Sequence, residues 1–213
     1  MKIVITAGGP AAELPDFSLW EDVSYVGVDA GCMTLLEKGV HPVAVVGDFD
    51  SVSDAEYEHL RGMFPDLEKV SAEKDETDTE LALQKAVELG GNHITVIGVT
   101  GGRLDHYMSA LHAVYNYQER YSDVAFEIVN YRNRLRFLSI GEHQVGSDPA
   151  YKYISFYPFS EAIEGFHLKG FKYEVVDETI PFGSTRFVSN ELDGEGMVVI
   201  GRGNCLMIES SDI

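Results

Sequence analysis

The chain has 213 residues, of which 45% are apolar and 24% are charged, a composition typical of a globular protein with a buried core. The formal net charge of −19 argues against a nucleic-acid partner, because binding a phosphate backbone requires a basic surface. No segment has the length of a membrane span, and the apolar run at residues 3–5 is too short for a signal peptide. We therefore expect a cytoplasmic protein that binds neither nucleic acid nor membrane. Cys32 and Cys205 have no metal-binding spacing, which predicts two buried, reduced thiols.

Up to about residue 132, short β-rich runs alternate with segments of helical periodicity. This alternation predicts βαβ units and a mostly parallel sheet. The expected strands are residues 3–7, 25–28, 43–46, 67–71, 94–99 and 125–129. The expected helices are residues 34–38, 54–63, 79–89 and 106–118. Ser53 and Glu56 have the spacing of a capping box at the start of the second helix.

After residue 132 the helical periodicity disappears, and short alternating segments follow, separated by Gly, Pro, Asn and Asp. The expected strands here are residues 135–140, 153–157, 173–176, 185–188, 197–200 and 205–209. This pattern predicts a small antiparallel β domain, a sandwich or a barrel. We therefore expect two domains. Residues 1–132 would form an open, mostly parallel α/β sheet, and residues 133–213 an antiparallel β-sandwich.

Acidic residues follow three consecutive strands of the predicted parallel sheet: Asp48 and Asp50, then Asp75 and Asp78, then Asp105. The carboxyl ends of parallel strands share one edge of a sheet, and ligands bind in the crevice outside it. Carboxylates that converge there would repel one another. A Mg²⁺ ion resolves this conflict, because it binds carboxylate and phosphate oxygens. The sequence therefore predicts a Mg²⁺ site formed by some of these five aspartates.

The same edge carries groups suited to binding ATP. Arg103 can present a planar fork of donors to phosphate oxygens. Glycine-rich turns let backbone N–H groups approach an anion closely, and two such turns lie here, at Gly8-Gly9 and at Gly101-Gly102. Carboxylates, a metal, an arginine and glycine-rich turns together are typical of phosphoryl-type transfer. The motifs of P-loop, dinucleotide-binding and α/β-hydrolase proteins do not occur in the sequence.

Several of these residues also have a structural explanation when taken singly. Asp75 and Asp78 lie at a helix start, where a cap or a dipole contact would suffice. Asp105 also begins a helix, and as a single residue it fits an N-cap better than a ligand. Asp29 fits a turn as well as it fits an ATP site. The coincidence of all these residues at one edge favours the functional interpretation.

Taken in order, these motifs resemble the thiamine pyrophosphokinase family. The motifs are Gly47-Asp48-Phe49-Asp50-Ser51, Asp75-x-x-Asp78 and Gly101-Gly102-Arg103-x-Asp105-His106. Two later segments are similar to the C-terminal signature of the family, Leu168-x-Gly170-x-x-Tyr173 and Val188-Ser189-Asn190-Glu191. The turn Asp29-Ala30-Gly31 is similar to its Asp-Gly-Gly turn, with Ala30 in place of the first glycine.

The resemblance implies a homodimer with an ATP-binding α/β domain and a β-sandwich domain. It implies transfer of pyrophosphate from ATP to the hydroxyl of thiamine, which gives thiamine diphosphate and AMP. By the same implication, the five aspartates surround the metal and the phosphates. Ser189 and Asn190 would help to form the thiamine pocket, although from sequence alone they fit a hairpin turn.

As a mechanism, we expect the thiamine hydroxyl to attack the β-phosphorus of ATP in line while AMP leaves. Arg103 would donate to the phosphate oxygens, and one aspartate would take the hydroxyl proton. The sequence leaves open which aspartate does so; Asp50, Asp78 and Asp105 are the catalytic candidates. Two alternatives stay open. A Mg²⁺-dependent phosphohydrolase would need no alcohol acceptor, and a non-enzymatic nucleotide sensor would bind ATP without turnover.

Overall fold

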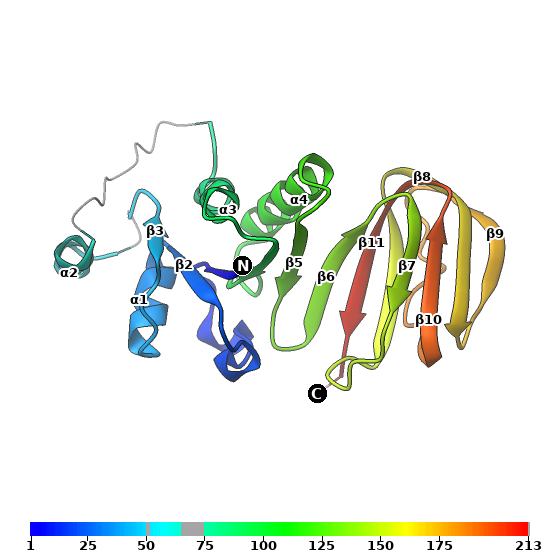
Figure 1. Cartoon of the computed structure of the whole chain (residues 1–213), viewed down its shortest axis with the longest axis horizontal. Coiled ribbons are helices and arrows are strands. Elements are labelled where there is room, and N and C mark those ends of the chain that lie inside the picture. The colour runs from blue at the N-terminus through cyan, green and yellow to red at the C-terminus, as the bar shows by residue number, and fades with distance from the viewer. Residues whose placement is uncertain (50–51, 65–74, 213) are drawn as a thin grey trace. The chain divides into compact units, whose positions relative to one another are not determined.

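The structure is a computed structural model that describes residues 1–49, 52–64 and 75–212. Its chain forms two compact units, Met1–Tyr131 and Arg132–Ile213 (Figure 1). The expected strand at residues 67–71 and the candidate Asp50 lie outside the described residues. Among the described residues, no helix has the length and apolarity needed to cross a membrane.

The first unit contains a parallel sheet, as predicted. Its strands, in the order in which they pair, are β3 (Ala44–Val46), β2 (Ser24–Val28), β1 (Lys2–Thr6), β4 (His93–Ile97) and β5 (Ala125–Val129). The central strands β1 and β4 are buried on both faces after their first residue, as is usual in a parallel sheet covered on both sides. The chain winds from β1 towards β3 and then returns to add β4 and β5 on the other side. The winding therefore reverses between β1 and β4, and this is where such sheets bind ligands.

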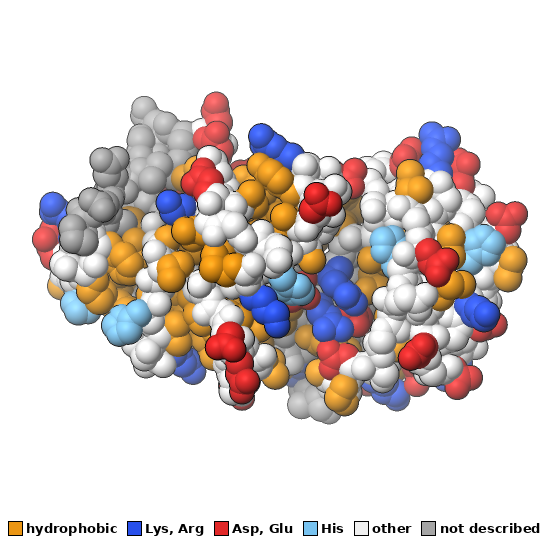
Figure 2. Space-filling view, in the orientation of Figure 1, with side chains coloured by type: hydrophobic (Ala, Val, Ile, Leu, Met, Phe, Trp, Pro, Cys, Tyr) orange, Lys and Arg blue, Asp and Glu red, His pale blue; other side chains and the backbone are white. Residues whose placement is uncertain are grey.

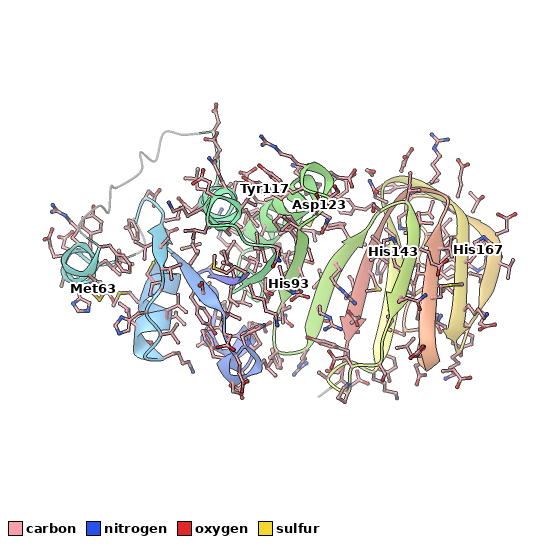
Figure 3. All side chains as sticks on the ribbon, in the orientation of Figure 1. Met63, His93, Tyr117, Asp123, His143 and His167 are labelled. Carbon is pink, nitrogen blue, oxygen red and sulfur yellow. The ribbon has the colours of Figure 1, made fainter. Side chains whose placement is uncertain are left out.

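The helices of this unit are α1 (Ala30–Glu37), α2 (Asp54–Met63), α3 (Asp78–Glu88) and α4 (Leu104–Arg120). Two short 3₁₀ turns, η1 (Ala11–Glu13) and η2 (Phe17–Leu19), follow β1. The capping box predicted for α2 is confirmed, because the Ser53 side chain accepts from the Glu56 N–H and the Glu56 carboxylate accepts from the Ser53 N–H. Tyr117 on α4 donates to the Glu80 carbonyl and so ties α4 to α3 (Figure 3).

Helix α1 begins at Ala30, four residues before the expected start. Gly31 suggested a turn, yet it is helical and packs against the end of β1. A Cβ built on Gly31 would lie 2.1 Å from the Thr6 carbonyl oxygen. The glycine therefore serves the close approach of the helix to the sheet and does not break the helix.

The second unit is an antiparallel β unit, as predicted. Its strands are β6 (Asn133–Leu138), β7 (Gly141–Val145), β8 (Tyr153–Phe171), β9 (Val175–Ile180), β10 (Leu192–Ile200) and β11 (Arg202–Ser210). They pair in the order β6-β11-β8-β10-β7, and β9 also pairs with β8. The first part of β8 pairs with β11, and its last part pairs with β10 and β9, so this one strand belongs to both layers. Phe156, Phe166 and Phe171 meet edge to face in the core between the layers.

Three expectations for this unit were wrong. Residues 185–188, expected as a strand, form a turn in which Phe187 is buried while Val188 is exposed. The strand β7 was missed. The strand β8 runs well beyond the predicted residues 153–157, because Ser160 and Gly165 adopt positive φ angles that bend it without ending it. Bends of this kind have the same sequence signature as turns.

Charged side chains are spread over the surface. On the face shown in Figure 2, acidic side chains are scattered over both units and interspersed with basic ones. This distribution agrees with a net negative charge that mainly keeps the protein solvated.

Candidate active site

A pocket of about 910 Å³ lies in the first unit at the carboxyl edge of the parallel sheet. Its walls are the loop after β1, the turn after β2, the segment after β3, the start of α3 and the connection from β4 to α4. The pocket thus occupies the point where the winding of the sheet reverses. The predicted site residues that line it are Gly8, Gly9, Asp29, Asp48, Asp78, Gly102, Arg103 and Asp105.

Three aspartates converge in this pocket. Asp29, Asp48 and Asp78 each offer a carboxylate oxygen, and these oxygens all lie within 4.8 Å of one another. The three residues come from different elements and are half-buried. Such a group of like charges favours the binding of a hard cation with oxygen ligands. Asp48 and Asp78 were predicted to form a metal site, whereas Asp29 was predicted to bind ATP.

The backbone around Asp29 explains how its carboxylate reaches the group. Asp29 has φ +46°, and its Oδ1 accepts a hydrogen bond of 3.1 Å from the Phe49 N–H. Gly47 has φ +143°, and a Cβ there would lie 1.9 Å from Asp29 Oδ1. Only glycine fits at position 47, because a side chain would displace the Asp29 carboxylate as well as strain the backbone. The glycine of the Gly47-Asp48-Phe49 motif thus positions an acidic residue from another strand.

The start of α3 presents Asp78 to the pocket. Thr77 is the N-cap, and its hydroxyl accepts from the Glu80 N–H while the Glu80 carboxylate accepts from the Thr77 N–H. Because Thr77 serves as the cap, the Asp78 carboxylate is not required for capping. Asp75 is exposed and is not among the residues that line the pocket.

Arg103 and Asp105 form an ion pair at the start of α4. Arg103 Nε donates to Asp105 Oδ1 at 3.1 Å, and a second guanidinium nitrogen donates to Oδ2 at 2.5 Å. These hydrogen bonds from Arg103 lower the pKa of Asp105 to about 2, so the carboxyl group is ionised at neutral pH. The N-cap of α4 is Arg103, so the single-residue interpretation of Asp105 as an N-cap was wrong. Among the described residues, Asp105 does not join the group of three aspartates.

The two glycine-rich turns contain residues that line the pocket and residues that allow close packing between loops. The Gly9 N–H donates to the Gly98 carbonyl at 2.7 Å, and a Cβ on Gly9 would lie 2.4 Å from that oxygen. The Gly9 N–H is therefore already used where the loops after β1 and β4 meet. Gly8 and Gly102 line the pocket, while Gly101, with φ +79°, is exposed and is not among the lining residues.

In the second unit, Asn190 is buried and Ser189 is exposed. Asn190 Nδ2 donates to the Tyr173 carbonyl at 2.9 Å, and Asn190 Oδ1 accepts from the Tyr173 N–H at 3.0 Å. The Asn190 amide therefore fixes the backbone of Tyr173, and this is a structural role that the sequence did not reveal. The part of Ser189 and Asn190 in thiamine binding stays a prediction.

His106, Ser109 and Thr100 also line the pocket, and none of them was predicted. The signal for His106 was available, because it follows Asp105 directly, but a lone histidine at a helix start is more often structural.

His93 lies at the amino end of β4, at the opposite edge of the sheet from the pocket, and contacts Glu127 at 3.0 Å (Figure 3).

The fold and the pocket define a class: a parallel α/β unit with a carboxylate-lined pocket at its ligand-binding edge, followed in the chain by an antiparallel β unit. Residues 18–126 match the family described as "Thiamin pyrophosphokinase, catalytic domain". Residues 142–203 match the family described as "Thiamin pyrophosphokinase, vitamin B1 binding domain". The chain belongs to the thiamine pyrophosphokinase family, as the motifs predicted.

Known proteins of this family match the chain over its whole length. The chain is 37% identical to the thiamine pyrophosphokinase of Bacillus subtilis (strain 168), with all of both chains covered. A crystal structure of the Bacillus subtilis protein has a TM-score of 0.92 at 36% identity and is covered completely. A crystal structure of thiamin pyrophosphokinase from Geobacillus thermodenitrificans has a TM-score of 0.89 at 43% identity, with 100% of this chain and 98% of that chain covered.

Proposed function

We propose a magnesium-assisted mechanism for the reaction of this family, in which ATP and thiamine give AMP and thiamine diphosphate. The observation that carries it is the convergence of Asp29, Asp48 and Asp78 in the pocket that Arg103 also lines. Carboxylates and an arginine in one pocket can handle a charged polyphosphate without a P-loop.

The three aspartates fit Mg²⁺, because they offer hard oxygen donors from three elements within 4.8 Å of one another. When bound, the ion would supply positive charge that offsets the charge of the carboxylates and of the ATP phosphates. We propose Asp29, Asp48 and Asp78 as the residues that hold it. Asp50 and Asp75 stay sequence-based candidates.

Arg103 and Asp105 would orient the phosphates. With Nε and one terminal nitrogen on Asp105, the Arg103 guanidinium keeps its other N–H groups for phosphate oxygens. The thiamine hydroxyl oxygen forms a bond to the β-phosphorus, and the bond from that phosphorus to the oxygen it shares with the α-phosphorus breaks. AMP leaves, and a pocket carboxylate accepts the hydroxyl proton.

The second unit would bind thiamine. The match to a vitamin B1 binding domain supports this assignment, and exposed Ser189 beside fixed Asn190 is the candidate contact. We also propose that the protein works as a homodimer in the cytoplasm, as the family resemblance implies.

The test is to incubate the protein with ATP, Mg²⁺ and thiamine and to measure AMP and thiamine diphosphate together. The proposal expects equal amounts of both products, and none after EDTA is added. ADP or free phosphate without thiamine would favour the phosphohydrolase. ATP binding without turnover would favour the sensor. Full turnover in EDTA would contradict the proposed metal site but not the transfer of pyrophosphate to thiamine.

A further inference from the structure

Glu13 joins two loops that line the active-site pocket. It ends η1, the short turn that follows the pocket loop Gly8-Gly9-Pro10, and its N–H donates to the Pro10 carbonyl at 2.9 Å. Its carbonyl oxygen accepts from the Tyr131 N–H at 3.2 Å. Glu13 lies before the segment that matches the family's catalytic domain, which begins at residue 18.

The Glu13 carboxylate anchors the loop that follows β4. Its Oε2 accepts from Asn130 Nδ2 at 3.2 Å and from Thr100 Oγ1 at 3.5 Å. Asn130 Nδ2 also donates to Thr100 Oγ1 at 3.1 Å, which closes a triangle of three polar groups. Asn130 is only 6% exposed, while Glu13 and Thr100 are half-buried, so the Asn130 amide is shielded from water and depends on these hydrogen bonds.

The Glu13 side chain also occupies the space that a side chain at position 101 would need. Gly101 has φ +79°, and a Cβ built on it would lie 2.2 Å from Glu13 Cγ. The next two residues along the chain, Gly102 and Arg103, line the pocket. The Glu13 side chain thus packs against Gly101, and its carboxylate accepts a hydrogen bond from Thr100 at the start of the same turn.

Filling the space beside Gly101 does not by itself require a carboxylate at position 13. Among the described residues, no lysine, arginine or histidine forms an ion pair with this half-buried carboxylate. An apolar side chain could fill the same space, but it could not accept the hydrogen bonds from Asn130 and Thr100. A carboxylate at position 13 is explained if its hydrogen bonds fix the conformation of the Thr100–Arg103 turn and hence the position of Arg103.

We propose that Glu13 is a positioning residue that holds the Thr100–Arg103 turn so that Arg103 meets the phosphates of ATP. The proposal rests on the role proposed above for Arg103. Glu13 itself does not line the pocket. It therefore acts through Arg103 and not by touching substrate.

The first test compares Glu13→Ala with Glu13→Gln. Loss of the anchor should lower kcat/KM for ATP by about 10- to 100-fold, because small misplacements of a binding group have effects of this size. The KM for thiamine should stay unchanged. Glu13→Gln keeps an acceptor oxygen and the methylene groups, so it should retain activity within about twofold if the anchor matters rather than the charge. Glu21→Ala, an exposed carboxylate outside the pocket, is the matched control.

A double-mutant cycle with Arg103→Ala decides between positioning and general stability. If Glu13 acts through Arg103, the double variant should be no slower than Arg103→Ala alone. Additive losses would overturn the proposal, and so would an active Glu13→Ala enzyme beside an impaired Arg103→Ala enzyme. A fully active Arg103→Ala enzyme would overturn the proposed role of Arg103 instead. If Glu13→Ala does not fold, Thr100→Val removes the hydrogen bonds of the Thr100 hydroxyl to Glu13 and to Asn130 with little change of shape. It should show the same selective fall in kcat/KM for ATP, and an unchanged kcat/KM for ATP would overturn the proposal.

Discussion

Two of the three clustered aspartates, Asp29 and Asp48, lie in segments whose backbone conformations few residues adopt. Asp29 and Phe49 have φ angles of +46° and +56°, and Gly47 lies between β3 and Phe49 with φ +143°. For Asp29 and Phe49, which are not glycines, such a conformation costs free energy and persists where the surroundings enforce it. Here the result is that like charges are held close together. The stability of this region should therefore depend on what binds to it.

Replacing Asp48 with Asn should separate metal binding from folding. We expect activity to fall by about 100-fold or more, since loss of an electrostatic group at a reacting centre has effects of this size. In EDTA the Tm should be unchanged or higher, because one of three repelling charges is gone. The rise in Tm on adding Mg²⁺ should shrink or disappear. Asp123→Asn, an exposed turn residue, is the control, and equal behaviour of both variants would contradict the metal site.

Gly47→Ala should disturb the same group through the backbone. A Cβ would meet Asp29 Oδ1 at 1.9 Å, and alanine at φ +143° is strained. We expect a loss of about 1–3 kcal/mol in the free energy of unfolding, together with loss of activity. The control is Gly62→Ala, where α2 has open space for a methyl group and helix propensity predicts a gain of about 0.5–1 kcal/mol. Urea unfolding measures both, and an active, stable Gly47→Ala enzyme would contradict this account.

At the residue scale, the sequence indicates which residues carry chemistry but not which of them meet. Asp48, Asp78 and Arg103 could be placed at one edge, because they follow parallel strands. That Asp29 joins them depends on the φ angle of Gly47, and no periodicity reports it. The pairing of Asp105 with Arg103 is likewise a matter of rotamers at a helix start.

At the scale of elements, the capping boxes of α2 and α3 provide a matched pair for a test. Thr77→Ala and Ser53→Ala remove the same kind of hydrogen bond, and each should cost about 1 kcal/mol of stability. Only α3 presents a member of the aspartate group, Asp78. We therefore expect Thr77→Ala to raise the Mg²⁺ concentration needed for half-maximal activity, and Ser53→Ala to leave it unchanged. Similar effects of both variants would show that the α3 cap does not position Asp78.

The elements themselves were predicted correctly where the local sequence signals agree with one another. The bounds of α2 agree with the prediction because its capping box and its periodicity coincide. The parallel strands were found because they are short apolar runs between helices. In the second unit, β8 was cut short and residues 185–188 were misassigned. A bend inside a long strand and a true turn use the same residues, and only pairing with β10 and β11 distinguishes them.

At the scale of the whole molecule, each unit carries one thiol buried in its own interior. Cys32 lies in a buried cluster with Phe49 and Leu60 in the first unit, and Cys205 lies in the core of the second. Burial raises the pKa of each thiol to about 12. At pH 8 the folded chain therefore contains almost no thiolate, and an alkylating reagent can react only after the surrounding unit opens.

The rate of alkylation at each cysteine should report how the units unfold. With ATP and Mg²⁺ present but thiamine absent, the first unit gains stability by binding. Ligand at about 100 times its Kd adds about 2.7 kcal/mol, which should slow modification of Cys32 by roughly 100-fold. Cys205 should be slowed much less, because its unit has its own core. Peptide mass spectrometry after iodoacetamide pulses measures both rates in one sample, with urea-unfolded protein as the fully reactive reference. Equal protection of both thiols would show instead that the two units open together as one cooperative structure.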